Sequence, residues 1–135
     1  MANTDTVFAG SIPALYDRYL GPLLFEPYAR ETAARLADLK AGTLLETAAG
    51  TGLVTSALAA RLPASVKIIA TDLNQAMLDF AAAKPDLARV ELRQADALAL
   101  PFGDASFDAV VCQFGAMFFP DRVRGYREAY RVLRP

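Results

Sequence analysis

The chain has 135 residues, of which 54% are hydrophobic and 21% are charged. This length fits one domain, and that much apolar material can form a core, so intrinsic disorder is excluded. Lys and Arg number 14 against 15 Asp and Glu, which gives no reason to expect a nucleic-acid partner because such partners favour a basic face.

The predicted elements begin with a helical region at the N-terminus. Residues 12–25 have the pattern of a short helix followed by a turn at Gly21-Pro22. A second helix is expected from Pro27, which suits a first helical position, and Gly42 is expected to end it.

Strands and helices alternate through the rest of the chain. The expected strands cover residues 43–46, 66–71, 90–93 and 107–112. The expected helices cover residues 51–62, the segment capped by Asn74, and residues 120–133. This alternation predicts an α/β fold, a Rossmann-like, doubly wound parallel sheet with helices on both faces. Within this single domain, residues 1–40 would form an N-terminal helical cap and residues 41–135 the core.

The last expected helix is rich in arginine. Its arginines are Arg122, Arg124, Arg127, Arg131 and Arg134. A solvated helix face is the favoured interpretation, and a binding patch is the alternative.

A loop with two glycines follows the first expected strand, at residues 46–52 (Glu-Thr-Ala-Ala-Gly-Thr-Gly). Glycine lets the backbone turn sharply and approach a ligand closely. The helix after the loop directs free N–H groups at a carboxylate or phosphate. A tight turn without a ligand would have the same pattern, so the loop alone does not decide between the two.

Acidic residues follow the next two strands. Asp72 ends the second strand about 20 residues after the loop, the spacing of a ribose-binding acid, and the alternative role of helix cap already falls to Asn74. Asp96 follows the third strand and could accept from an adenine amino group while the N–H of Ala97 donates to the ring. A turn-forming Asp96 is the alternative. Because the carboxyl ends of neighbouring strands meet in one crevice, these elements together predict a ligand site there.

These features resemble the class I S-adenosylmethionine (SAM) dependent methyltransferases, particularly the group related to the quinone-biosynthesis methyltransferases. The resemblance is carried by the glycine loop and by residues 70–74 (Ala-Thr-Asp-Leu-Asn), 94–102 (Gln-Ala-Asp-Ala-Leu-Ala-Leu-Pro-Phe), 106–112 (Ser-Phe-Asp-Ala-Val-Val-Cys) and 128–135 (Glu-Ala-Tyr-Arg-Val-Leu-Arg-Pro). It covers nearly the whole chain, and it implies SAM as the cofactor and a small-molecule methyl acceptor, whose identity stays open.

The resemblance also implies a set of cofactor-binding residues. Ala48, Gly50 and Gly52 would line the methionine part, and Glu46 and Thr51 of the same loop would also bind the cofactor. Asp72 would hold the ribose, Leu73 and Met77 would flank the adenine, Asp96 and Ala97 would read its edge, and Gln113 would border the methyl group. Tyr16 and Tyr19 resemble the aromatics that close over the cofactor, with simple core packing as an equal alternative. Methyl transfer from a sulfonium needs no metal, and Asp17 and Tyr16 are conceivable bases, but no base is assigned.

Two departures from the family pattern follow. Ala48 stands where the family usually has glycine, and we expect little effect from it. Family members usually continue beyond Pro135 with three more strands, so we expect a sheet that lacks them and leaves its fourth strand at an open edge. Val110, Val111 and residues 114–119 would then be uncovered, and we expect two chains to form a homodimer through that edge.

The cysteine and hydropathy patterns bear on location. The chain has one cysteine, Cys112, and no histidine, which excludes an internal disulfide and the usual structural zinc sites and fits a reducing compartment. No apolar run approaches the ~20 residues of a membrane span, and residues 1–10 lack the pattern of a signal peptide. We expect a cytoplasmic protein without a transmembrane segment.

Two other functions remain open at this point. The first is an NAD-binding oxidoreductase, because Gly50-x-Gly52-x-x-Thr55 is close to the dinucleotide fingerprint and Asp72 has the right spacing, although the Asp96-Ala97 pair is then unexplained. The second is a non-catalytic truncated domain that binds SAM or only associates with itself, because a fold alone does not prove turnover.

Overall fold

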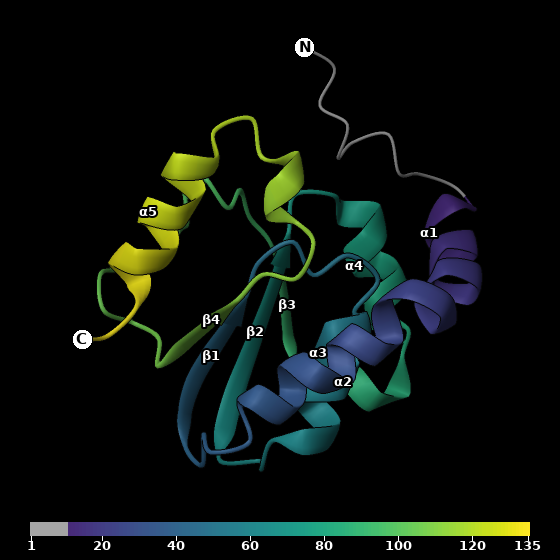
Figure 1. The fold of residues 1–135 in the computed structure, drawn as a ribbon, viewed down its shortest axis with the longest axis horizontal. Coiled ribbons are helices and arrows are strands. Elements are labelled where there is room, and N and C mark those ends of the chain that lie inside the picture. Colours follow the sequence, from purple (N-terminus) through teal and green to yellow (C-terminus); the bar gives the residue numbers. More distant parts are fainter. Residues whose placement is uncertain (1–10) are drawn as a thin grey trace.

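The computed structural model describes residues 11–135, so the expectation that residues 1–10 are not a signal peptide lies outside the described residues. Four strands form one parallel sheet in the order β3-β2-β1-β4 (Figure 1). Their bounds are β1 Gly42–Glu46, β2 Val66–Asp72, β3 Glu91–Gln94 and β4 Ala109–Val111. The predicted α/β, Rossmann-like parallel sheet is confirmed.

The N-terminal region is helical throughout, where the sequence predicted a turn at Gly21-Pro22. It consists of α1 (Ile12–Leu15), the π-helix η2 (Tyr16–Phe25) and α2 (Glu26–Arg35). Pro22 lies inside η2. Since proline has no N–H to donate, wider π winding accommodates the interruption without ending the helix, and the predicted turn is wrong.

The expectation that Gly42 ends the second helix is also wrong. That helix ends at Arg35, and Gly42 begins β1 with a φ of +103°. A Cβ at this position would collide with the carboxylate of Asp108, which accepts a hydrogen bond from the N–H of Thr43 (2.8 Å). Glycine is therefore required here by the strand entry rather than by a helix cap.

Two apolar layers cover the sheet, one on each face. The remaining helices are α3 (Leu53–Arg61), α4 (Gln75–Ala82), η3 (Pro85–Leu87), η4 (Ala116–Phe118) and α5 (Arg122–Val132). Leu44 of β1 packs with side chains of α2 and α3, whereas its neighbour Leu45 packs with Phe107 and with Val132 of α5. Successive strand residues point to opposite faces, so the Leu44-Leu45 pair supplies both layers.

The two edges of the sheet differ. β3 forms one edge, and β4, shorter than the predicted 107–112, forms the other. Within residues 11–135, no strand pairs with the outer side of β4, and Phe107, which precedes β4, forms an isolated parallel bridge with Leu133. Also among these residues, no helix is long and apolar enough to cross a lipid bilayer.

Candidate cofactor site

The candidate site lies where the chain leaves β1 between its two neighbouring strands. After β1 the chain turns to one side to form β2 and later to the other to form β4, so this is the switch point at which open α/β sheets bind ligands. The loop is tied to both neighbours, because the N–H of Thr47 donates to the carbonyl of Val111 (2.9 Å) and that of Ala49 to the carbonyl of Thr71 (2.9 Å). The glycine loop is thus held open at the carboxyl edge of the sheet.

Three residues of the loop have left-handed backbones: Ala48 (φ +53°), Gly50 (φ +59°) and Gly52 (φ +88°). A Cβ on Gly52 would lie 2.7 Å from Cδ1 of Leu87, so the loop packs tightly on that side. A Cβ on Gly50 would meet nothing within 4 Å. The open backbone at Gly50 is the cradle that a closely bound ligand needs.

Glu46 is the buried acid at the start of the loop. Its side chain is 2% exposed, and Oε2 accepts a hydrogen bond from Oγ1 of Thr55 (2.5 Å). The pKa of Glu46 is raised to about 8, chiefly by burial; the Thr55 hydrogen bond opposes the rise, and the negative charge of Asp72 adds to it. Glu46 is therefore protonated at neutral pH, and a cation brought to it would favour release of that proton.

Asp72 joins the loop to the turn that follows β2. Its Oδ2 accepts from the N–H of Gly50 (2.8 Å), and its Oδ1 accepts from the N–H of Asn74 (2.8 Å). Asn74 itself caps α4, accepting from the N–H groups of Ala76 and Met77, as the sequence predicted. These two bonds hold the Asp72 carboxylate between the glycine loop and the turn that leads into α4.

Asp96 lies in the turn after β3, the third predicted element. Its Oδ1 accepts from the N–H of Leu98 (2.9 Å), and the preceding Ala95 donates to the carbonyl of Asp72 (3.1 Å). The turn-forming role of Asp96 therefore accounts for one of its two carboxylate oxygens, Oδ1. Within the described chain Oδ2 of Asp96 accepts no hydrogen bond, so the same side chain still offers an oxygen to a ligand.

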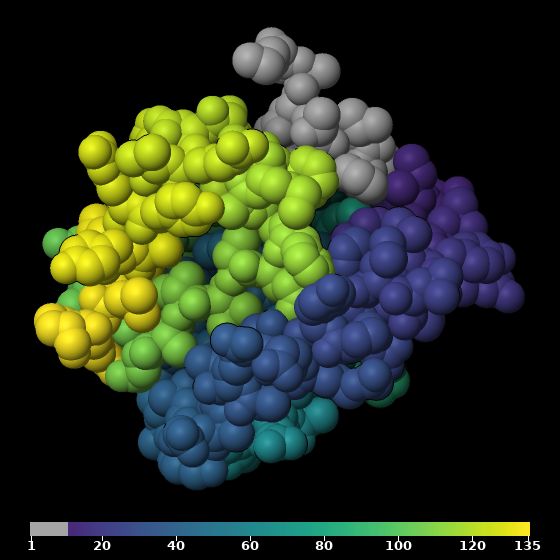
Figure 2. Space-filling view, in the orientation of Figure 1, coloured from purple at the N-terminus to yellow at the C-terminus, as the bar shows by residue number. Residues whose placement is uncertain are grey.

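Gln113 and Tyr16 approach the loop from the other side. Oε1 of Gln113 accepts from Oγ1 of Thr32 (2.7 Å), and Tyr16 stacks on Phe25 with ring centroids 5.1 Å apart. In Figure 2 the segment that contains Gln113 lies against the purple-blue N-terminal helices, which agrees with the edge-on contact of Phe114 with Tyr28 at 5.2 Å. These contacts close the crevice over the glycine loop.

The space left beneath this cover is small. A cavity of about 40 Å³ is lined by ten residues, namely Tyr16, Phe25, Glu46, Ala48, Ala49, Gly50, Thr51, Leu53, Val54 and Gln113. Sites for small molecules usually measure roughly 300–1,000 Å³, so this cavity by itself is too small for a whole nucleoside cofactor. Burial, and secondarily the charge of Asp72, raise the pKa of Tyr16, which makes its hydroxyl a poor base.

The structure does not bring every predicted residue to this cavity. Tyr19 is 55% exposed, with the guanidinium of Arg18 5.4 Å from its ring centre, so it faces away. Leu73 lies after β2, where its carbonyl accepts from Nε2 of Gln94, and Met77 is buried in α4. These two, with Gly52, Asp72, Asp96 and Ala97, are not among the residues that line the cavity.

Sequence reasoning missed one contact that holds η2 on the loop. Oδ1 of Asp17 accepts from Oγ1 of Thr51 (2.8 Å) and from Nζ of Lys84 (2.6 Å). Asp17 was considered only as a conceivable base, and here it is an ion-paired anchor instead. Lys84 lies 67 positions along the chain from Asp17, so no local pattern could have revealed the pair.

Similarity to known proteins identifies the family of the chain. A family model described as a methyltransferase domain matches residues 44–135. The chain belongs to this family. The match contains the glycine loop, Asp72, Asp96 and Gln113, the residues that form or border the crevice.

Individual relatives agree with the family. The chain is 37% identical over 133 residues to a demethylmenaquinone methyltransferase of Deinococcus radiodurans, an alignment covering 96% of this chain and 55% of that protein. It superposes on a SAM-dependent methyltransferase structure from Methanococcus maripaludis with a TM-score of 0.76 and 25% identity, covering 92% of this chain and 57% of the other. It also superposes on SAM-bound CalS10, an amino pentose methyltransferase of Micromonospora echinaspora, with a TM-score of 0.74 and 26% identity, covering 90% and 52%.

These findings separate the alternatives left open by the sequence. The methyltransferase-domain family and its SAM-dependent relatives do not support the NAD-binding oxidoreductase. The chain spans about half the length of the curated relatives it matches. Their activity therefore bears on this chain as a proposal.

Proposed function

We propose that the chain binds SAM and transfers its methyl group to a small-molecule acceptor. The observation that carries the proposal is the position of Asp72. Its carboxylate stands at the carboxyl end of β2, bonded to the N–H of Gly50, and so lies beside the one part of the loop where the backbone is open. An anionic acceptor of hydrogen bonds at this place suits the two hydroxyls of a ribose.

The other crevice residues would divide the cofactor between them. Ala48, Gly50 and Gly52, with Thr51, would hold the methionine part along the left-handed loop, and Glu46 would face its ammonium group. Leu73 and Met77 would flank the adenine. Asp96 and Ala97 would read the adenine edge, because Oδ2 of Asp96 has no protein donor among the described residues. This residue set fits SAM in both charge and order along the strands.

The cover over the crevice would complete the site. Gln113 would border the methyl group, and Tyr16 would close over the cofactor. Tyr19 would act only in an arrangement of η2 different from the present one, since it now faces solvent.

The chemistry asks for orientation rather than for an acid or base from the protein. When bound, SAM supplies a methyl group already activated by its positive sulfur. The chain's part is to align donor and acceptor and to exclude water, and such alignment can contribute several kcal/mol. Neither conceivable base suits the role, because Asp17 is engaged by Lys84 and the pKa of Tyr16 is raised.

The first test is calorimetric titration with SAM and S-adenosyl-L-homocysteine. We expect saturable binding in the micromolar range, and we expect Asp72→Asn to weaken it by about 1–3 kcal/mol, the scale of a charge-assisted hydrogen bond. Asp79→Asn is the matched control, since Asp79 lies on the exposed side of α4 and bonds only Gln75. Affinity that is unchanged in Asp72→Asn would remove Asp72 from the site, and no binding at millimolar SAM would remove the function.

We also propose that two copies of the 135-residue chain pair through the outer edge of β4. That edge has no strand partner in residues 11–135, and Met117 and Phe118, in η4 after β4, are 53% and 59% exposed. Unpaired edges with apolar neighbours favour association. Light scattering at micromolar concentration should give twice the chain mass, and Met117→Glu/Phe118→Glu should give the monomer. A monomeric wild-type chain would contradict the proposal.

A cytoplasmic location is a further proposal. Its support is the single cysteine, Cys112, which is exposed and unpaired and would stay reduced there. Fractionation of cells that express the tagged chain tests this, and recovery in a membrane or secreted fraction would count against it.

A further inference from the structure

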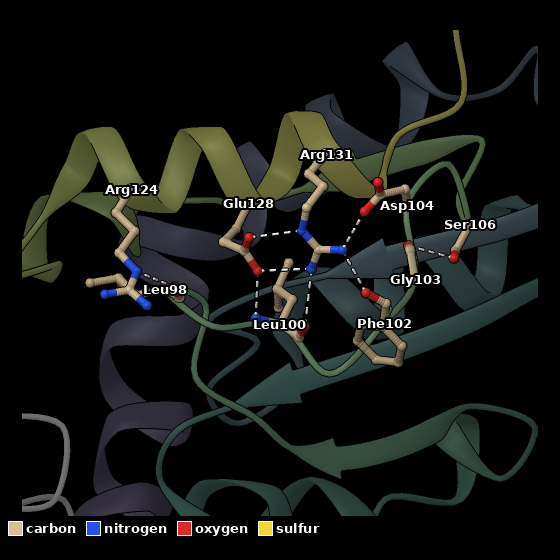
Figure 3. Close-up of polar contacts among 9 residues, drawn as sticks. All are labelled: Leu98, Leu100, Phe102, Gly103, Asp104, Ser106, Arg124, Glu128 and Arg131. Carbon is tan, nitrogen blue, oxygen red and sulfur yellow. Dashed lines mark hydrogen bonds and ion pairs between the residues drawn. The ribbon is translucent and has the colours of Figure 1, made fainter.

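One face of α5 holds the loop that follows β3. Arg124, Glu128 and Arg131 stand four and three positions apart, so their side chains share that face. Nε of Arg124 donates to the carbonyl of Leu98 (2.7 Å), and Oε2 of Glu128 accepts from the N–H of Leu100 (2.8 Å) (Figure 3). The helix thereby binds backbone groups of the turn that follows Asp96.

Arg131 is the centre of this network. Its Nε and Nη2 form a bidentate pair with Glu128 (2.8 and 2.9 Å), and Nη2 also donates to the carbonyl of Leu100 (3.1 Å). Its Nη1 donates to the carbonyl of Phe102 and to Oδ1 of Asp104, both at 2.8 Å (Figure 3). Bidentate guanidinium–carboxylate pairs are directional, so the network fixes the loop in one place.

The arginines of α5 are therefore not equivalent. The solvated-face interpretation is incomplete for Arg124, Arg131 and, just beyond α5, Arg134, because each also bonds protein groups; Arg134, for example, pairs with Asp108 at 2.8 Å. Arg127 fits the interpretation, since it is exposed and has no hydrogen bond or ion pair among the described residues. The helix thus supplies its own control residue.

Arg124 acts at the point where the loop leaves the Asp96 turn. Leu98 donates its N–H to Oδ1 of Asp96 and accepts from Arg124 through its carbonyl. On the other side of the turn, Ala95 donates to the carbonyl of Asp72. Asp96 is thus held between β2 and α5. The direction of its Oδ2 is set by the bonds of Ala95 and Leu98 on either side, since Oδ2 itself has no hydrogen bond among the described residues.

We propose that Arg124, supported by Glu128 and Arg131, is a positioning residue that makes the Asp96 turn selective for adenine over a 6-oxopurine. The inference rests on the proposed function, in which Asp96 reads the adenine edge. The 6-amino group of adenine donates to a carboxylate, whereas the 6-oxo group of hypoxanthine repels it. A carboxylate that is fixed in place discriminates between the 6-amino and the 6-oxo group. A carboxylate on a mobile turn can move away from the 6-oxo group, which relieves the repulsion and lowers the discrimination.

The experiment compares two ligands on each variant. Calorimetry gives the dissociation constants of S-adenosyl-L-homocysteine and of its deaminated analogue, S-inosyl-L-homocysteine. We expect the wild-type chain to prefer the adenosyl ligand about tenfold or more, the scale of one charge-assisted hydrogen bond. Asp96→Asn, which keeps the acceptor for Leu98, should abolish the preference. Arg124→Met should reduce it at least about threefold, and Arg127→Met should leave it unchanged.

The ratio of the two affinities separates positioning from general support of the fold. If Arg124→Met weakens both ligands equally, or keeps the wild-type ratio, the positioning role is overturned. If Arg124→Met lowers the ratio in the wild-type background but not on top of Asp96→Asn, the two residues act as one unit. A wild-type chain that binds both ligands without preference overturns this inference and leaves the SAM site standing, whereas one that binds neither overturns the proposed function as well.

Discussion

The two sides of the crevice are built by different means. On the glycine-loop side, position comes from left-handed backbone, from ladder-like bonds to β2 and β4, and from the buried pair of Glu46 and Thr55. On the side of the Asp96 turn, position comes from charged side chains of α5 that bond backbone groups of the loop. The first side uses groups removed from water, and the second uses ion pairs in contact with it.

This difference sets how each side responds to change. A group deep in the protein feels a change of protonation or of one methyl group strongly, because little solvent relieves it. Solvent-exposed ion pairs contribute little to global stability, so the α5 network should affect the local position of the loop more than the free energy of unfolding. Each prediction below tests one part of this contrast.

The largest expected effect is a fall in stability with pH caused by Glu46. Its ordinary pKa is 4.5 and its folded value is about 8. Between these values the unfolded chain loses the proton and the folded chain keeps it, so the stabilisation is complete below about pH 4.5 and is lost as the pH rises to about 8. Urea unfolding should show roughly 3 kcal/mol lost between pH 5 and 8, and Glu46→Gln should remove that slope.

Glu128 on the other side of the crevice is the matched control. Hydrogen bonds from Arg131 lower its pKa, so any contribution it makes is present above its ordinary pKa and is lost in acid. Glu128→Gln should therefore keep the alkaline slope of the wild type. Equal slopes in the wild type and in Glu46→Gln would show that the folded chain does not hold a proton at Glu46.

The next effect concerns the tight side of the glycine loop. Gly52→Ala places a Cβ at a φ of +88° and 2.7 Å from Cδ1 of Leu87. Backbone strain and overpacking together should lower the free energy of unfolding by about 2–3 kcal/mol. Gly103→Ala is the control in the α5-bound loop, where φ is not left-handed and only Oγ of Ser106 lies near, at 3.6 Å. Equal unfolding midpoints for the two variants would contradict the contrast.

The same contrast explains what the sequence could predict. The glycine-loop side was predictable, because its features are local in the chain: a strand, a loop with Gly50 and Gly52, and an acid at the end of the next strand. The alternation of strands and helices also predicted a sheet of parallel strands. The ends of the elements were predicted less accurately. Gly42 was assigned to a helix end because a glycine that ends a helix and one that begins a strand look the same in the sequence.

Contacts between distant side chains were beyond this reasoning. Arg131 and Asp104 are 27 residues apart, and Asp17 and Lys84 are 67 apart, so each pair depends on the finished fold. The arginine-rich segment had the composition of a solvated face, and only the loop packed against it showed that Arg124 and Arg131 have backbone partners. Composition reports what a helix can bind but not what lies beside it.

The smallest effect concerns Ala48, where the sequence predicted little consequence of replacing glycine. Its φ of +53° places an L-residue in the left-handed region, so Ala48→Gly should raise the free energy of unfolding by about 1 kcal/mol. Ala48 also lies close to the turn after β4, because a Cβ on Gly115 would collide with the Cβ of Ala48. Gly115→Ala should therefore destabilise the chain alone and do so less in the Ala48→Gly background, as a double-mutant cycle by urea unfolding would measure. Additive effects would mean that the two loops do not touch in solution, and the glycine-loop side would then owe its position to its own backbone and its bonds to β2 and β4, without support from the turn after β4.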